Sequence, residues 1–233
     1  MKRDFDSEAP ELMDRPQPVS PELEVDLRNL RHLNRFFGSY ALVRRFLERW
    51  ISRGDSVRIL DLATGSGDIP RLIVDHARAA GASVRVTAVD QQRSTLEIAR
   101  ALSTNYPEIE FVKADVLSFE GDEKFDIVLC SLALHHFSET DAARLLARAR
   151  DLSRRCTLVA DLRRGALATA GVYLLTALVF REPMTRTDGR LSAARSFSFA
   201  ELRALAERAG WTKFGHRRFR FARQAIWIEP RTT

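Results

Sequence analysis

The 233-residue sequence predicts an α/β fold in which a parallel sheet is covered by helices on both faces. From residue 56 onward, apolar runs of strand length alternate with longer segments whose apolar residues recur at helical spacing. The strand runs are apolar almost throughout, which is typical of parallel strands buried on both faces. The chain is long enough for one substantial domain with small additions.

Three regions follow one another along the chain. Residues 1–21 are acidic and contain four prolines, which predicts a disordered or loosely attached arm. Residues 22–54 have apolar residues at helical spacing with a break at Gly38, which predicts a helical cap of two helices or one kinked pair. The main domain is expected over residues 55–233.

Strands and helices of the main domain can be placed in order. Five strands are predicted, at residues 56–60, 84–90, 109–115, 125–134 and 156–162. Helices are predicted between and after them, at residues 69–81, 94–104, 140–153 and 199–210. A helical insertion is expected over about residues 166–198, and two closing strands over residues 211–219 and 223–229.

Charge and cysteine content bear on the partners of the protein. The net charge is +6, and residues 151–233 hold 16 Lys and Arg against 7 Asp and Glu. Such a basic segment is compatible with nucleic acid, an anionic membrane surface, an acidic substrate or arginine-rich solvated faces. Cys130 and Cys156 lie in apolar strand-like runs and are expected to be reduced core residues.

The sequence predicts a cytoplasmic protein without a transmembrane segment. The first residues are charged and lack the apolar core of a signal peptide. The apolar run at residues 166–180 is shorter than the roughly 20 residues that a spanning helix needs. Peripheral membrane contact stays open, and the oligomeric state is not indicated.

The segment ILDLATGSGDIP, residues 59–70, predicts a strand that passes through a glycine-containing turn into a helix. Pro70 stands where a dinucleotide-binding turn needs its third glycine, and no Lys-Ser/Thr pair follows as in a phosphate-binding loop. Asp61 and Asp68 would repel a pyrophosphate and suit a cationic ligand. S-adenosylmethionine, a sulfonium cation with an ammonium group and no phosphate, meets these conditions.

Two more acidic residues end neighbouring strands. Asp90 ends the strand at residues 84–90, where a carboxylate can accept both hydroxyls of a ribose. Asp115 ends the next strand, where an adenine amino group could be held. Because ligands of open α/β sheets bind at the carboxyl ends of the strands, these acids are expected to share one site with Asp61.

At this point the chain resembles class I S-adenosylmethionine-dependent methyltransferases, over about residues 25–229. The resemblance rests on ILDLATGSGDIP, AVDQQ, KADVLSFEGDEKFDIVLCSLALHHF and the late WTKFGHRRFRFARQAIWIE. It implies a Rossmann-like, doubly wound sheet of seven strands in the order 3-2-1-4-5-7-6, with the last strand antiparallel. It also implies S-adenosyl-L-methionine as cofactor and S-adenosyl-L-homocysteine as product. The cofactor contacts of the family map onto Asp61, Ala63, Gly65, Asp90, Gln91, Asp115, Val116 and Ser131, with Ala63 where many members have glycine.

A narrower similarity concerns the substrate. LRNLRHLNRFFGSY, CSLALHHF and ADLRRGALA look like segments of small bacterial methyltransferases of polyketide and quinone pathways. This implies a hydrophobic small molecule as substrate, with O-methylation of a phenol or enol as the leading hypothesis. C-methylation of a quinone-type ring, methylation of RNA or protein, and cofactor binding without catalysis stay alternatives. Nucleic acid is disfavoured, because CSLALHHF lacks the Asn/Asp-Pro-Pro-Tyr motif of enzymes that methylate base amines.

His135 and His136 are the candidate catalytic residues, since they follow the strand at residues 125–134 and imidazoles titrate near neutrality. One of them could take the proton of a phenol or enol. The alternative is that they cap or pack beneath the following helix. No metal site is predicted.

Candidate substrate contacts come from three other places. Arg163 and Arg164 follow the fifth strand and could pair with a carboxylate or phenolate, or be solvated surface. Tyr40 could belong to a lid over the cofactor or to the core between the two N-terminal helices. The apolar residues 167–180 could wall a substrate pocket or belong to the core.

Overall fold

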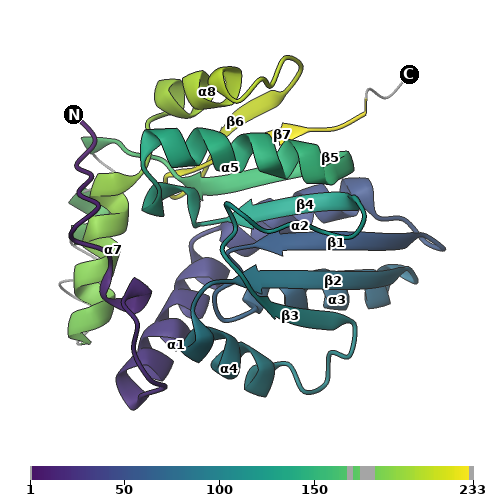
Figure 1. Cartoon of the computed structure of the whole chain (residues 1–233), viewed down its shortest axis with the longest axis horizontal. Helices are drawn as coiled ribbons and strands as arrows, with labels where there is room; N and C mark the ends of the chain where they lie inside the picture. The colour runs from purple at the N-terminus through teal and green to yellow at the C-terminus, as the bar shows by residue number, and fades with distance from the viewer. Residues whose placement is uncertain (1, 167–169, 174–181, 231–233) are drawn as a thin grey trace.

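The computed structural model describes residues 2–166, 170–173 and 182–230. In these residues the strands form one seven-stranded sheet in the order β3-β2-β1-β4-β5-β7-β6 (Figure 1). β7 is antiparallel to both β5 and β6, and the other neighbouring pairs are parallel. The predicted strand order and the reversed strand are therefore confirmed. The strands are β1 Ser56–Leu62, β2 Ser83–Asp90, β3 Ile109–Lys113, β4 Phe125–Ser131, β5 Ser153–Leu162, β6 Gly215–Phe219 and β7 Arg223–Ile228.

Helices cover both faces of the sheet, as the apolar strands require. The α-helices described are α1 Pro21–Phe36, α2 Ser39–Trp50, α3 Asp68–Ala80, α4 Arg93–Leu102, α5 Glu139–Leu152, α7 Pro183–Arg195 and α8 Phe199–Arg208. Two short 3-10 helices, η1 Leu12–Asp14 and η2 Leu134–His136, are also present.

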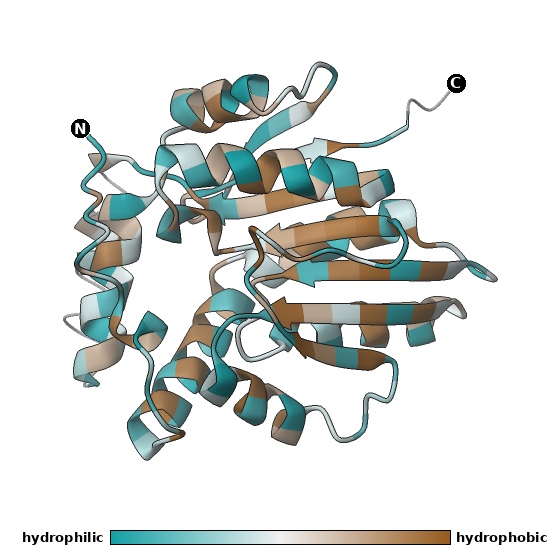
Figure 2. Cartoon of the chain, in the orientation of Figure 1, coloured by the Kyte–Doolittle hydropathy of each residue, from teal (hydrophilic) through white to brown (hydrophobic). Residues whose placement is uncertain are grey.

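The core is divided by the sheet into two layers. Side chains of a strand point alternately to opposite faces, and β4 shows this directly. Ile127 and Leu129 pack with α2 and α3, whereas Val128 and Cys130 pack with α5 and α8. Figure 2 shows the hydrophobic residues concentrated in these central strands. Cys130 and Cys156 are buried and not disulfide-bonded, as expected.

Local signals in the sequence explain where the helices begin. Ser20 accepts a hydrogen bond from the backbone N–H of Leu23, and Pro21 occupies the first position of α1. Ser198 and Glu201 form a reciprocal capping box at the start of α8. Gly38, with a φ of 84°, separates α1 from α2 at the break that the sequence predicts.

The N-terminal arm differs from the expectation. Instead of being disordered or loosely attached, it runs beside α7 at the side of the sheet where β1, β2 and β4 end (Figure 1). The carboxylate of Asp188 accepts the backbone N–H groups of Leu12 and Met13, at 2.8 and 3.0 Å. The guanidinium of Arg3 donates to the carbonyl of His135 at 3.0 Å. The composition misled because the arm has only the short η1 of its own, and its position depends on hydrogen bonds with distant residues such as Asp188.

The insertion after β5 is described only in part. Residues 167–169 and 174–180, which hold most of the apolar segment predicted as core or pocket wall, lie outside the described residues. The following α7 packs against α1 and η1. Among the residues that the structure describes, no helix combines the length and the apolar character needed to cross a membrane.

Candidate functional site

A cavity of about 930 Å³ lies at the edge of the sheet where the parallel strands end. Its wall is built from the loops after β1, β2, β4 and β5, together with parts of α1, α7 and the N-terminal arm. Open α/β sheets bind their ligands at this edge. The volume lies near the upper end of the range for small-molecule sites, which leaves room for two ligands side by side.

The glycine-containing loop after β1 presents its backbone to the cavity. Ala63, Gly65 and Gly67 have φ values of 58°, 54° and 71°, in the left-handed region. Gly65 lines the cavity, and a Cβ atom placed on it would meet open space. Ala63 also lines the cavity, in a conformation that costs a non-glycine residue about 1 kcal/mol. This loop is therefore shaped for close approach of a ligand to the main chain.

Asp90, at the end of β2, is held in place beside this loop. Its Oδ2 accepts the backbone N–H of Gly65 at 2.8 Å, and its Oδ1 accepts that of Gln92 at 2.9 Å. Burial raises the pKa of Asp90, and these two hydrogen bonds offset part of the rise. Asp90 and Gln91 both line the cavity, and the predicted contacts of Asp90 with the ribose and of Gln91 with the cofactor stay predictions.

Three buried polar atoms in or near the loop lack a hydrogen-bond partner within the described residues. They are Oδ2 of Asp61, near the end of β1, Oγ1 of Thr64 in the loop, and Oγ of Ser131, at the end of β4. Burial raises the pKa of Asp61 to about 7, and the nearby carboxylates of Asp68 and Asp90 add to the rise. Thr64 and Ser131 line the cavity, so a ligand with hydrogen-bonding groups such as S-adenosylmethionine could satisfy their hydroxyls. Asp61 does not line the cavity, and its predicted contact with the cofactor stays a prediction.

Asp115 does not join the other acids. Its side chain is exposed, lies outside the cavity wall, and accepts the backbone N–H of Leu117 at 2.9 Å, which stabilises the turn after β3. The next residue, Val116, is 5% exposed and does line the cavity. The predicted contact of Asp115 with adenine therefore stays a prediction, while Val116 is placed as expected.

His135 lies at the cavity wall in η2 and is 2% exposed. Its Nδ1 is 2.6 Å from Oδ1 of Asp161, and its backbone N–H donates to Oδ2 of the same carboxylate at 2.9 Å. The buried carboxylate of Asp161 thus fixes both the main chain and the ring of His135. This bond places the proton of the neutral ring on Nδ1 and leaves Nε2 as the acceptor atom.

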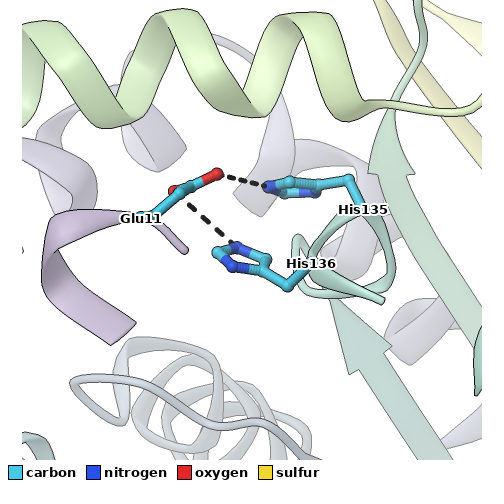
Figure 3. Close-up of side chains that lie close together, drawn as sticks. All are labelled: Glu11, His135 and His136. Carbon is cyan, nitrogen blue, oxygen red and sulfur yellow. Dashed lines mark ion pairs between the residues drawn. The ribbon is translucent and has the colours of Figure 1, made fainter. Parts of the chain in front are cut away.

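His136 has the same arrangement with a carboxylate of the arm. Its Nδ1 is 2.5 Å from Oδ2 of Asp14. Burial alone would lower the pKa of His136, but the carboxylates of Glu11 and Asp14 and the bond to Asp14 raise it to about 10. Figure 3 shows Glu11 pointing from the arm toward both rings, with its carboxylate oxygens 3.9 Å from Nε2 of His135 and 3.9 Å from Nε2 of His136.

The two predicted arginines have different surroundings. Arg163 lines the cavity, as a substrate contact should. Arg164 does not: it is buried, and its guanidinium donates to the carbonyl of Ser196 at 2.5 Å and to the carboxylate of Glu201 at 2.6 Å. The prediction for Arg164 is therefore wrong, because its fork joins the end of β5 to the start of α8.

Tyr40 also lies outside the cavity wall, which favours the alternative of a core residue between the N-terminal helices over a substrate contact. Its hydroxyl donates to Oδ2 of Asp68 at 2.9 Å, and its ring packs with the core between α2 and α3. Asn34 donates to the same oxygen at 2.9 Å. Asn34 and Phe37 of the N-terminal helical region line the cavity in place of Tyr40.

Three carboxylates of the site were missed from the sequence, namely Glu11, Asp14 and Asp161. Asp161 carried a usable signal, since it stands near the end of a parallel strand like Asp61 and Asp90. Glu11 and Asp14 carried no such signal, because the neighbouring sequence is acidic and rich in proline and therefore indicates a terminal arm rather than part of a buried site.

Comparison with known proteins agrees with this geometry. Residues 59–155 match the family model described as a methyltransferase domain. The matched range runs from β1 to the start of β5 and includes the glycine-containing loop, Asp90 and both histidines. The sheet order described above is the one that the resemblance to class I enzymes implied.

Residues 59–155 are thus similar to a methyltransferase domain. A curated relative of this domain is the 2-phytyl-1,4-naphtoquinone methyltransferase of Thermosynechococcus vestitus, 34% identical over 82 residues. These residues make up 35% of this chain and 35% of that protein, so the match spans about a third of the relative's length.

Solved structures show how widely the fold of this methyltransferase domain is shared. The S-adenosylmethionine-dependent methyltransferase SibL has a TM-score of 0.64 at 22% identity, over 90% of this chain and 59% of its own. Human N-acetylserotonin methyltransferase, solved with S-adenosylmethionine, has a TM-score of 0.61 at 18% identity, over 88% and 55%. Magnesium protoporphyrin IX methyltransferase of Synechocystis, solved with S-adenosylhomocysteine, has a TM-score of 0.55 at 17% identity, over 92% and 90%. These structures show that the fold of this chain is shared by methyltransferases that were solved with S-adenosylmethionine or S-adenosylhomocysteine.

Proposed function

We propose that the chain transfers a methyl group from S-adenosylmethionine to an oxygen atom of a hydrophobic small molecule, a phenol or an enol. One observation carries this proposal: the same cavity is lined by the cofactor loop with Asp90 and by the histidine pair. Methyl donor and acceptor can therefore be held in one enclosed space, and positioning is the main source of rate for an in-line displacement.

The wall of the cavity supports a hydrophobic acceptor. α1 and the arm contribute mainly apolar side chains to it: Met13, Leu27, Leu30, Leu33 and Phe37. Such a wall favours an aliphatic or aromatic molecule through the removal of apolar surface from water. Arg163 adds a positive group that can pair with a phenolate or carboxylate of the acceptor.

Each group of the chain has a part in the proposed reaction. Asp90 would hold the ribose, and the loop with Gly65 would contact the rest of the cofactor through its backbone. When bound, S-adenosylmethionine supplies an electrophilic methyl group and leaves as S-adenosylhomocysteine. The acceptor hydroxyl, placed beside the histidine pair, loses its proton, and its electron pair forms the new bond to carbon. Whether His135 or His136 takes that proton, as the sequence suggests, stays a prediction.

A second candidate is methyl transfer to a ring carbon of a quinone-type molecule. It is favoured by the 34% identity to a methyltransferase named for a naphthoquinone, although only over 82 residues. The basic residues 151–233 keep RNA and protein as further acceptors to be tested.

The distribution of label among acceptors tests the proposal. Purified protein and methyl-labelled S-adenosylmethionine are incubated in parallel reactions with three kinds of acceptor. These are a panel of phenols, enolic lactones and quinones, total RNA, and cell protein. We expect label in the phenol or enol products. Label confined to quinones would favour the second candidate, and label confined to RNA or protein would contradict both.

A further inference from the structure

Glu11, His135 and His136 form a cluster whose geometry goes beyond hydrogen bonding. One ligand atom of each residue lies within 4.8 Å of those of the other two. The two contacts of Glu11 with Nε2 atoms, at 3.9 Å each, are too long for hydrogen bonds. Two atoms bound to one ion at about 2.1 Å lie at most about 4.2 Å apart. In a tetrahedral site two such atoms lie about 3.4 Å apart, so the three side chains would have to move closer together to bind one ion.

The orientation of both rings is the one that metal-binding histidines have. A ligating histidine usually donates its other ring N–H to a carboxylate, which fixes the tautomer and makes the ligand more basic. Here Nδ1 of His135 faces Asp161 at 2.6 Å, and Nδ1 of His136 faces Asp14 at 2.5 Å. Both Nε2 atoms are thereby left to face Glu11, as Figure 3 shows. Two separate carboxylates, Asp161 and Asp14, thus orient the two imidazoles so that both Nε2 atoms face the carboxylate of Glu11.

The charge of the cluster also favours a cation. Three carboxylates, those of Glu11, Asp14 and Asp161, surround two imidazoles in a largely buried position. Glu11 is 2% exposed and keeps one further hydrogen bond, from Ser192 at 2.9 Å. His136, whose pKa these carboxylates raise to about 10, supplies positive charge there as an imidazolium, and a bound metal ion would take the place of its proton.

We propose that Glu11, His135 and His136 bind a divalent transition-metal ion at the cavity wall, with Asp14 and Asp161 as the carboxylates that orient the two histidines. Two imidazoles and one carboxylate suit Zn²⁺, Fe²⁺, Co²⁺ or Ni²⁺ rather than Mg²⁺ or Ca²⁺, which prefer oxygen ligands. Three protein ligands leave at least one coordination position for an oxygen atom in the cavity.

This inference rests on the proposed function where it concerns the acceptor. A phenol or enol hydroxyl bound at the open position is acidified by the ion and releases its proton to water. The electron pair stays on the oxygen, forms the bond to the methyl carbon, and displaces the sulfur of the cofactor, which takes the electrons of the broken bond. The histidines then act as ligands, and a free imidazole base is not needed.

Metal content and metal affinity test the site without any assay of methyl transfer. The full chain is produced without a histidine tag, purified without chelators, and measured for Zn, Fe, Mn, Co, Ni and Cu by mass spectrometry. After chelator treatment it is titrated with Co²⁺, whose visible absorption reports the ligands, and with Zn²⁺ by calorimetry. We expect about one ion per chain and a Co²⁺ spectrum typical of four or five nitrogen and oxygen ligands.

Matched variants make the test specific. Glu11→Gln and His135→Gln remove ligands and should weaken Zn²⁺ binding by more than about 100-fold, whereas Asp161→Asn should weaken it by about 10- to 100-fold. Glu8→Gln, on the exposed part of the arm, and His32→Gln, exposed on α1, serve as controls and should bind as the wild type does. Calorimetric titration with S-adenosylmethionine shows whether each variant is folded.

The outcomes separate the metal site from the proposed function. Wild-type protein without bound metal and without saturable Co²⁺ or Zn²⁺ binding overturns the site, as does binding that Glu11→Gln and His135→Gln leave unchanged. Intact metal binding in a protein that does not bind S-adenosylmethionine would instead contradict the proposed function and leave the metal site standing.

Discussion

At the residue scale, Asp90 is the side chain on which cofactor recognition most depends. Asp90→Ala removes the charged acceptor for the ribose hydroxyls and should weaken S-adenosylmethionine binding by about 1.5–3 kcal/mol, or roughly 10- to 150-fold. Isothermal titration calorimetry measures the change, with the exposed Asp122→Ala as control. Because Asp90 also accepts the N–H of Gly65, thermal unfolding of the same variant shows whether the loop has lost its support. If Asp90→Ala and Asp122→Ala bind S-adenosylmethionine with equal affinity, Asp90 does not bind the ribose.

Two neighbouring arginines provide a paired test of substrate contact. Arg163 lines the cavity, whereas Arg164 is bound to Ser196 and Glu201. Arg163→Gln should raise KM for an acceptor that forms an anion by roughly tenfold, with unchanged stability. Arg164→Gln should lower the free energy of unfolding by about 2 kcal/mol, since two hydrogen bonds of a buried charge are lost, and leave KM unchanged. Steady-state kinetics and urea unfolding of both variants measure these effects. A raised KM in Arg164→Gln, or a loss of stability in Arg163→Gln, would contradict the assignment.

The predictability of the site differs from residue to residue for physical reasons. Asp61, Asp90 and Ser131 lie at the ends of parallel strands. The end of such a strand can be predicted, because it is where the apolar run of the sequence stops before the next helical segment. Tyr40 could not be placed from the sequence because the direction of its side chain depends on packing between α2 and α3. Glu11 was missed because its burial depends on contacts between the arm and α7, far apart in the chain.

At the element scale, the contact between α1 and α7 holds one side of the cavity and contains a buried acid. Asp26 is 0% exposed and accepts the hydroxyl of Thr185 at 2.7 Å, and Asn29 donates to the same hydroxyl at 3.1 Å. Burial raises the pKa of Asp26 to about 6; the bond from Thr185 opposes the rise, and the carboxylates of Glu11 and Glu182 add to it. The folded state therefore prefers the protonated acid.

The raised pKa of Asp26 predicts a pH-dependent stability. Its contribution is fully present below the unfolded value of 3.8 and is lost as the pH rises through about 6. Relative to Asp26→Asn, the free energy of unfolding of the wild type should fall by on the order of 2–3 kcal/mol between about pH 4 and pH 7. Urea unfolding across this range measures the difference. Parallel pH profiles of the two proteins would show that Asp26 ionises freely in the fold.

At the scale of the whole molecule, the alternation of strands and helices was enough to predict a parallel sheet covered on both faces, whereas the strand order and the reversed last strand were implied by the resemblance to class I methyltransferases. Near-continuous apolar strands required cover on both faces, and α2 and α3 on one side and α5 and α8 on the other provide it. The attachment of the N-terminal arm could not be predicted, because no periodic pattern marks a segment that is held by side chains of distant elements. The division into an arm at residues 1–21, a helical cap at residues 22–54 and a main domain stays a prediction.

The measurement that tests the central claim most directly is nuclear magnetic resonance of the product formed from ¹³C-methyl S-adenosylmethionine and a phenolic acceptor, with wild-type protein and with Asp90→Ala. The chemical shift of the label distinguishes a methyl group on oxygen from one on carbon or nitrogen. We expect a methoxy signal that grows with the wild type and is strongly reduced with Asp90→Ala at limiting cofactor. A protein that binds the cofactor yet transfers no label to any small molecule, or only to macromolecules, would contradict the proposed function.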